Sequence, residues 1–436
     1  MRMDWLDLFP ISTQGKQNGG GLRIGGCRVR DLAEEWGTPL YLYDAATLQA
    51  QVRLINRLLG EAYPGPALAA YAAKAYLSLR FARKLSAMGL GVDCVSLDEL
   101  AIAGQAGFPV EKIHLHGNNK SLEEIETAMR LGIQSIVVDS LDELGFLEQA
   151  AARLDLHGVR IWLRITPGLE VATHAYRQTG HLGSKFGLPL QDGQAAEAIQ
   201  RALASPRLRL TGLHTHLGSQ LFEVEPYQAA LRSLCRLAHD QGYTPEEISP
   251  GGGWGVPYHP DDQDVPLERW IYGVSTTLAT ISQGYGWPLP RLVLEPGRWL
   301  VARAGVSVYT LGTSKRLPDG SCVAAVDGGM ADNPRPALYQ SRYTACLVDR
   351  PLAPPAQNWR LVGKFCESGD MLIQEVPLPK FQRGDLLAMP VSGAYQLSMA
   401  SNYNLAPRPA VLWVEDGRAE CLQPREKPST EGWWVS

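Results

Sequence analysis

Lys74 is a residue of this sequence that suggests covalent chemistry. It stands at the end of an apolar run, ALAAYAAK, over residues 67–74. An amine in that position can act as a nucleophile and form a Schiff base with an aldehyde. Taken alone, a lysine at the end of a strand is more often a side chain that simply reaches solvent. The chemical interpretation therefore depends on other residues.

Three further features could bind the rest of such a ligand. The segment SPGGGWG, residues 249–255, offers backbone N–H groups with no side chains around them, which suits a phosphate. Glu295 in LEPGR would be a buried carboxylate that needs a cationic or protonated partner. His216 in GLHTHLG could stack on a flat ligand. Their ordinary alternatives are a common glycine turn, a salt bridge from Glu295 to Arg298 or another arginine, and a satisfied core histidine.

Together these groups match one ligand, pyridoxal 5'-phosphate (PLP). Lys74 suits its aldehyde, the glycine turn its phosphate and His216 its ring face. PLP accepts electrons only while its pyridine nitrogen is protonated, and a facing carboxylate such as Glu295 would keep the proton there. The cysteines and histidines form no compact array, so we expect no metal site.

The elements that must position these residues alternate between short β-like runs and helical segments. Alternation over roughly 230 residues predicts parallel strands joined by helices, and eight such units close a (β/α)8 TIM barrel. An open doubly wound sheet is the structural alternative. The predicted strands are residues 67–74, 89–96, 112–117, 135–140, 159–165, 210–218, 246–253 and 291–297.

Polar residues stand at the carboxyl ends of these strands, where barrels collect their reactive groups. They are Lys74, Asp93, Ser96, His116, Asn118, Asp139, Arg164, His214, His216, Glu295 and Arg298. Between the strands, a serine followed three residues later by a glutamate predicts helix N-caps at Ser96, Ser121 and Ser140. A ring of catalytic side chains is therefore expected at one end of the barrel.

The pattern changes after about residue 305, where short β-branched or aromatic runs are separated by Gly, Pro and Asp. This pattern of short runs predicts a second, C-terminal antiparallel β-barrel-like domain. The N-terminal segment GLRIGGCRVR, residues 21–30, has the same character and is expected to join it. We therefore predict a barrel over residues 39–304 and a β domain over residues 1–38 and 305–436.

Composition excludes several classes of protein. With 45% hydrophobic and 20% charged residues, the chain of 436 residues can bury a large core. Its 41 Lys and Arg and 45 Asp and Glu form no charged block, so nucleic-acid and membrane-surface binding are not expected. No apolar run reaches the roughly 18 residues of a membrane span, and the N-terminus lacks a secretory pattern. Seven scattered cysteines fit free thiols in a reducing compartment, so we expect a cytoplasmic location.

Motifs along nearly the whole chain carry a more specific resemblance. The sequence resembles the fold-type III PLP-dependent decarboxylases, most closely the diaminopimelate decarboxylases. The segments that carry the resemblance are GTPLYLYD (37–44), YAAKA (71–75), GVDCVSLDEL (91–100), T-G-x-x-x-SKFG (179–187), GLHTHLGSQ (212–220), SPGGGWG (249–255), LEPGR (294–298), DGGMADNPRPALY (327–339), CESGD (366–370) and GAYQLSMASNYN (393–404).

The resemblance implies roles for particular residues. Lys74 would hold PLP covalently, His216 would stack on its ring, and Glu295 would pair with the ring nitrogen. The other cofactor-binding positions would be Asp93, Ser219, Gly252, Gly253, Gly297, Arg298 and Tyr395. The substrate-binding positions would be Arg298, Arg335, Tyr339, Glu367 and Tyr395, with Glu367 on the distal ammonium. Cys366 would come from the partner chain and lie near the reacting carbon.

The implied activity is removal of CO2 from the D-configured centre of meso-2,6-diaminopimelate to give L-lysine, by a homodimer with shared active sites. Relatives with most of these motifs decarboxylate ornithine, arginine, carboxynorspermidine or carrier-protein-bound glutamyl groups, and such a substrate is the alternative. Lys364, Phe365 and Gln396 depart from the family pattern and could alter the Cys366 loop or the substrate fit.

Two other classes of PLP protein are less consistent with the motifs. An alanine-racemase-like enzyme favours an arginine opposite the ring nitrogen, where this sequence has Glu295, and would leave CESGD without a purpose. Non-catalytic PLP carriers are usually short and single-domain, whereas this chain has an additional β domain with its own Arg, Tyr, Cys and Glu motifs.

Overall fold

The structure is a computed structural model that describes residues 5–16, 20–169 and 183–427. It contains two compact units. The first comprises Met1–Gln51, Val256–Gln263 and Leu300–Ser436, and the second Val52–Gly255 and Asp264–Trp299. Residues 179–182, the first four of the T-G-x-x-x-SKFG motif, lie outside the described residues. Within the described chain, every helix is too short or too polar to cross a membrane.

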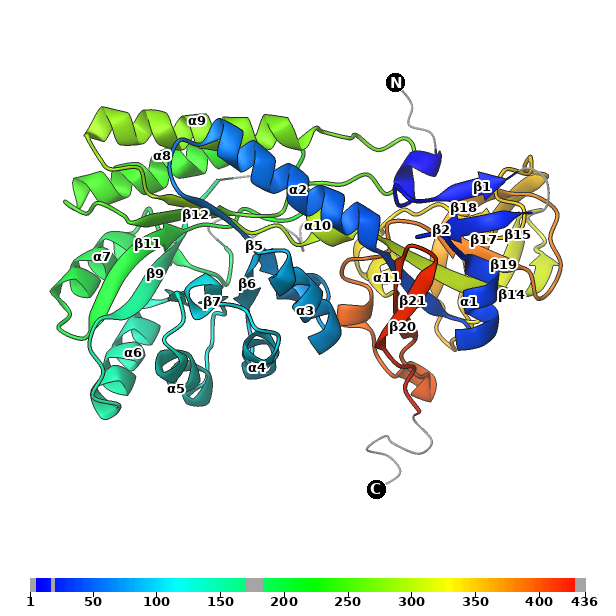
Figure 1. Cartoon of the computed structure of the whole chain (residues 1–436), viewed down its shortest axis with the longest axis horizontal. Helices are drawn as coiled ribbons and strands as arrows, with labels where there is room; N and C mark the ends of the chain where they lie inside the picture. Colours follow the sequence, from blue (N-terminus) through cyan, green and yellow to red (C-terminus); the bar gives the residue numbers. More distant parts are fainter. Residues whose placement is uncertain (1–4, 17–19, 170–182, 428–436) are drawn as a thin grey trace. The chain divides into compact units, whose positions relative to one another are not determined.

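The second unit is a closed barrel of eight parallel strands, which confirms the predicted (β/α)8 fold (Figure 1). Each strand pairs with its neighbour in parallel, and the pairing of β8 with β9 closes the ring. The strands are β5 (Ala67–Ala72), β6 (Gly91–Cys94), β7 (Ile113–Leu115), β8 (Ser135–Val138), β9 (Val159–Thr166), β11 (Leu208–His214), β12 (Glu247–Gly251) and β13 (Arg291–Leu294), and the short β10 (Leu188–Pro189) pairs with β9. Apolar side chains fill the interior, among them Leu68, Val137, Trp162 and Val293.

Helices follow the strands and cover the outside of the barrel (Figure 1). They are α2 (Ala45–Ala62), α3 (Leu79–Ala87), α4 (Leu97–Gln105), α5 (Leu122–Leu131), α6 (Leu141–Arg153), α7 (Gln194–Ala204), α8 (Glu225–Asp240), α9 (Leu267–Tyr285) and the short α10 (Arg298–Val301). The predicted serine N-caps are present, since Ser96, Ser121 and Ser140 each accept the N–H three residues later. This bond satisfies one of the free N–H groups at each helix start.

The glutamates of these capping motifs divide into two kinds. Glu124 returns its carboxylate to the N–H of Ser121 and completes a capping box. Glu99 and Glu143 instead accept the N–H of the residue that precedes the capping serine, Val95 and Asp139, at 2.7 Å each. The glutamate therefore also fixes the last residues of the strand end that precedes the helix.

The first unit is built on a sheet with the order β18-β17-β15-β14-β4-β20-β21, joined by β16 and β19. These strands are β4 (Leu40–Asp44), β14 (Gly305–Arg316), β15 (Cys322–Val326), β16 (Cys346–Leu347), β17 (Gln357–Val362), β18 (Met371–Leu378), β19 (Leu386–Met389), β20 (Ala410–Glu415) and β21 (Arg418–Gln423). The separate β domain is thus confirmed, with a refinement: β4–β20 and β15–β17 pair in parallel. Parallel partners need long connections, so local sequence could not reveal them.

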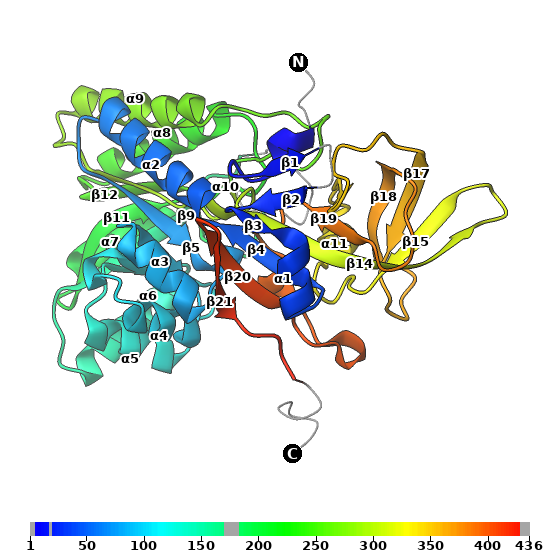
Figure 2. The same cartoon turned by 45° about the vertical axis from the view of Figure 1, so that its right-hand side comes forward.

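The N-terminal segment forms a small antiparallel sheet of its own, β1 (Gln14–Lys16), β2 (Gly21–Ile24) and β3 (Cys27–Arg28), followed by α1 (Val29–Trp36). Its apolar side chains, including Leu22 and Ile24, share one core with strands β4, β14 and β20. Figure 2 shows β14, β15, β17 and β18 of this unit more openly. Strand β4 belongs to this sheet although residue 40 falls in the range predicted for the barrel, so the exact domain bounds stay a prediction.

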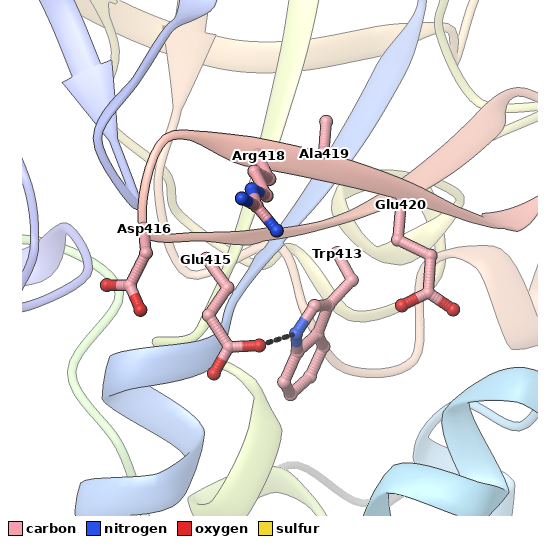
Figure 3. Close-up of a pocket in the computed structure, with 6 residues that line it drawn as sticks. All are labelled: Trp413, Glu415, Asp416, Arg418, Ala419 and Glu420. Carbon is pink, nitrogen blue, oxygen red and sulfur yellow. Dashed lines mark hydrogen bonds between the residues drawn. The ribbon is translucent and has the colours of Figure 1, made fainter.

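A pocket of about 550 Å³ lies at the β20–β21 hairpin (Figure 3). It is lined by Trp413, Glu415, Asp416, Arg418, Ala419 and Glu420. Two neighbours already hold the Glu415 carboxylate, because the Trp413 indole N–H and the Gln49 amide each donate to it at 2.9 Å. The pocket carries none of the residues predicted for the active site.

At the amino ends of the barrel strands, Glu247 is a buried carboxylate with several donors. It accepts hydrogen bonds from the Gln134 amide at 2.8 Å and the Trp162 indole N–H at 2.9 Å, and it contacts the Arg291 guanidinium at 3.4 Å. A side chain at Gly212 would come within 2.7 Å of the Trp162 nitrogen. This end of the barrel is therefore closed by a well-satisfied polar network.

We expect Glu247→Ala to destabilise the protein by about 3 kcal/mol, because it leaves buried donors without an acceptor. The measurement is the urea unfolding midpoint. Glu246→Ala is the matched control: Glu246 pairs with Arg209 at 2.8 Å on the surface, so its loss should cost less than about 1 kcal/mol. Equal midpoints for the two variants would contradict this account.

Candidate active site

Lys74 lies in a short 3-10 turn, Ala73–Ala75, directly after β5. The Tyr71 hydroxyl holds this turn, because it donates to the Tyr76 carbonyl at 2.7 Å and accepts the Tyr76 N–H at 3.1 Å. Ala73 and Ala75 are buried, whereas the Lys74 side chain is exposed at the carboxyl end of the barrel. The apolar strand thus ends in an amine that reaches solvent at the carboxyl end of the barrel.

Glu295 follows β13 and is a buried carboxylate, 7% exposed. The Ser249 hydroxyl donates to Oε1 at 2.7 Å, and the Nε2 atom of His214 lies 3.0 Å from Oε2. These partners replace the salt bridge to Arg298 that was the simpler alternative. Strands β11, β12 and β13 therefore each contribute one side chain to this group.

His116 connects Glu295 to a second carboxylate. Its Nε2 atom lies 3.7 Å from Glu295 and 3.8 Å from Asp93, and its ring meets that of His214 edge-on at 4.8 Å. Burial, then the nearby Glu295 charge, raises the pKa of Asp93 well above its usual range, and the Lys74 charge partly offsets this. His116, His214, Glu295 and Asp93 thus form one buried cluster from four strand ends.

The histidines of this site are neutral. Burial is the main cause that lowers the pKa of His116, His214 and His216 well below the usual 6.5. A neutral imidazole can donate from one ring nitrogen and accept at the other. His214 can therefore donate to Glu295 without cancelling the negative charge of the carboxylate.

His216 lies two residues after His214, just beyond the end of β11. Its ring is half-buried, and its Nδ1 atom accepts the N–H of Gly252 at 3.3 Å. This bond fixes the ring orientation and leaves Nε2 to carry the proton. The His-Thr-His sequence at residues 214–216 is the signal from which a place for His214 in the site could have been inferred.

The glycine turn after β12 is required by close backbone contacts. A Cβ atom at Gly252 would lie 1.8 Å from the carbonyl oxygen of Glu295, and one at Gly253, where φ is +94°, 1.9 Å from that of Gly218. Only glycine fits such approaches. The sequence prediction of freely exposed N–H groups needs correction for Gly252, because its N–H is bonded to His216.

Arg298 and Ser219 converge on the phosphate side of the predicted site. The Arg298 guanidinium donates to the Ser219 hydroxyl at 3.0 Å, and Arg298 is 6% exposed. Gly297 precedes it directly, at the turn between β13 and α10. A buried cation beside a hydroxyl suits an anionic group.

The remaining predicted residues lie in the other compact unit and are described within it. Arg335 opens α11 (Arg335–Tyr339) and is fully buried, with its guanidinium 4.3 Å from the Tyr258 ring and bonded to the Tyr343 hydroxyl. Tyr339 and Tyr395 are half-buried. Cys366 and Glu367 are exposed on the loop between β17 and β18.

The residues of the barrel fit PLP. Lys74 offers the amine, Arg298 and Ser219 the anion site, His216 a ring face and Glu295 the carboxylate. Within the described part of the chain, buried atoms of the cluster also remain without a hydrogen-bond partner, namely Asp93 Oδ1, His116 Nε2 and His214 Nδ1. Buried polar atoms are rarely left unpaired unless a ligand or water completes them.

Comparison with known proteins shows the family of the chain. The family model described as pyridoxal-dependent decarboxylase, pyridoxal binding domain, matches residues 46–302. Diaminopimelate decarboxylase of Bacillus subtilis (strain 168) is 40% identical over 423 residues, 96% of this chain and 96% of its own. That of Bacillus methanolicus is 40% identical over 415 residues, covering 94% and 96%.

Solved structures give the same result. The crystal structure of diaminopimelate decarboxylase from M. jannaschi has a TM-score of 0.87 and 31% identity over 96% of both chains. The Helicobacter pylori enzyme complexed with L-lysine has a TM-score of 0.82 and 31% identity over 92% of this chain and 97% of its own. The chain therefore belongs to the pyridoxal-dependent decarboxylases, in the diaminopimelate decarboxylase family.

Proposed function

We propose that this protein is a PLP-dependent carboxy-lyase that converts meso-2,6-diaminopimelate to L-lysine and CO2, the last step of lysine biosynthesis by the diaminopimelate pathway. The observation that carries the proposal is the Glu295 cluster at the mouth that bears Lys74, in a chain 40% identical to diaminopimelate decarboxylases over 96% of its length.

The barrel residues would bind the cofactor. When bound, PLP supplies an electron sink for the electron pair left by the departing CO2. Lys74 would hold it covalently, yield to the substrate amine and return to release the product. Glu295 would keep a proton on the ring nitrogen, with Asp93 nearby and His216 on the ring face. The phosphate would be bound by Ser219, Gly253, Gly297, Arg298 and Tyr395.

The β domain would bind the substrate. Arg335 and Tyr339, with Arg298 and Tyr395, would hold its distal carboxylate, because guanidinium groups bind carboxylates in two-point contacts. Glu367 would accept the distal ammonium. Cys366 would donate the thiol proton to Cα after CO2 has left, which completes the exchange of a carboxylate for a hydrogen.

We further propose a homodimer in which Cys366 and Glu367 complete the active site of the partner. Both residues are exposed in the single chain, as residues that reach a neighbouring site would be. A cytoplasmic location belongs to the same proposal, and the seven cysteines are all free thiols, as a reducing compartment favours.

A substrate panel tests the activity directly. Purified protein with PLP should release CO2 from meso-diaminopimelate and form L-lysine, both measured by mass spectrometry. Ornithine, arginine, carboxynorspermidine and a glutamyl carrier protein should be poor substrates. Turnover of one of these, with none of meso-diaminopimelate, would replace the proposed substrate by the alternative.

The attachment of the cofactor gives a second prediction. Borohydride reduction of the yellow holoenzyme should fix PLP to Lys74, located by peptide mass spectrometry, and Lys74→Ala should lose both the adduct and activity. Lys112→Ala is the control, because Lys112 lies at the amino end of β7 and its side chain makes only an exposed bond to the Gly89 carbonyl at 2.9 Å among the described contacts, so adduct and activity should be kept. An adduct on another lysine would refute the assignment of Lys74.

The proposed shared active site gives a third prediction. Lys74→Ala and Cys366→Ala homodimers should each be inactive, whereas a mixed dimer has one site with both residues intact. Mixing and refolding the two chains should therefore restore up to about a quarter of wild-type activity if random pairing yields half mixed dimers, each with one working site of two. Hybrids isolated by two affinity tags but without activity would contradict a shared site.

A further inference from the structure

Asp370, the last residue of CESGD, joins two loops of the first compact unit. It is 4% exposed. Its Oδ1 accepts the N–H of Met330 at 2.6 Å, and its Oδ2 accepts the N–H of Phe365 at 2.8 Å. Met330 belongs to the loop that leads into Arg335, and Phe365 directly precedes Cys366. One carboxylate thus connects the segment with the proposed proton donor to the segment with a proposed substrate-binding arginine.

Glycines on both loops make room for this carboxylate. A Cβ atom at Gly329 would lie 2.3 Å from Asp370 Oδ1, and one at Gly363 would lie 2.2 Å from Oδ2. Gly329 also has a φ of +150°, which side-chain-bearing residues rarely adopt. The two loops are therefore shaped around Asp370, which occupies the space that two side chains would otherwise fill.

Further bonds fix the backbone next to Cys366. The Lys364 N–H donates to the Gly328 carbonyl at 3.1 Å, a second direct connection between the same loops. The Cys366 N–H donates to the Asn404 side chain at 3.2 Å. Lys364 and Phe365, which depart from the family pattern, therefore both take part in the connection through their backbone N–H groups.

Within the connection, Asp370 is the group that requires a negative charge. Both of its partners are N–H donors, and a carboxylate accepts at both oxygens, whereas an amide accepts at one and donates at the other. An asparagine would therefore turn a donor toward one of the two N–H groups. The substitution keeps the size of the side chain and removes only the double acceptor.

We propose that Asp370 is a positioning residue that holds the Cys366 loop, which serves the partner's active site, against the loop of Arg335, which serves the chain's own site. This inference rests on the proposed function, because that reaction requires both loops in place. Asp370 touches neither substrate nor cofactor in this account.

The test is Asp370→Asn in the full-length holoenzyme. We expect kcat to fall about 100-fold, the scale of a misplacement near 1 Å, with PLP affinity and absorbance unchanged because Lys74, Glu295 and Arg298 belong to the barrel unit. The rate at which iodoacetamide alkylates Cys366, followed by peptide mass spectrometry, should also change. Asp319→Asn is the matched control: Asp319 accepts the Ser321 N–H at 2.9 Å in an exposed turn, and all readouts should stay at wild-type values.

A measurement on unaltered protein covers the case in which the variant does not fold. Hydrogen exchange of peptides spanning 328–335 and 363–370 should be slow at Met330 and Phe365, and exchange as fast as in an exposed loop would overturn the proposal. A folded Asp370→Asn with wild-type kcat and alkylation rate would overturn it too. Wild-type protein inactive on the whole panel would instead refute the proposed function.

Discussion

The burial of Glu295 in a closed barrel is the constraint on which the site depends. A buried carboxylate is unfavourable unless it is hydrogen-bonded and its charge is compensated. Ser249 and His214 supply the hydrogen bonds, and burial lowers the pKa of His214 well below its usual range. In the proposed cofactor site, a protonated pyridine nitrogen would place a cation next to this carboxylate. The carboxylate would thereby favour the protonated ring, which is the effective electron acceptor.

The glycine turn after β12 follows from the same arrangement. Gly252 approaches the Glu295 backbone so closely that no side chain fits, and its N–H orients His216. The carboxylate proposed for the ring nitrogen and the imidazole proposed for the ring face therefore both lie against the backbone of Gly252. A cofactor site built in this way is positioned by the strands and does not depend on a loop finding its own conformation.

Local sequence patterns were sufficient for the barrel and for the type of chemistry. Strand and helix periodicity, serine caps and the polar strand ends are all short-range signals, and they located Lys74, His216 and Glu295. The His116–Glu295 contact could not be inferred, because it joins the ends of β7 and β13, which are far apart in the chain. The parallel pairing of β4 with β20 and the two hydrogen bonds of Asp370 also join segments that are distant in the chain.

Two buried carboxylates of the same barrel show how polar satisfaction separates structural from functional roles. Glu247, at the amino ends of the strands, has an amide, an indole and a guanidinium as partners, so nothing is left for a ligand. Glu295, at the carboxyl ends, is hydrogen-bonded by a hydroxyl and an imidazole, and unpaired atoms of His214 and Asp93 lie in the same cluster. Both residues are acids beside apolar strands in the sequence. The unpaired atoms around Glu295 support the proposed cofactor role there, because buried polar atoms are rarely left without a partner unless a ligand or water completes them.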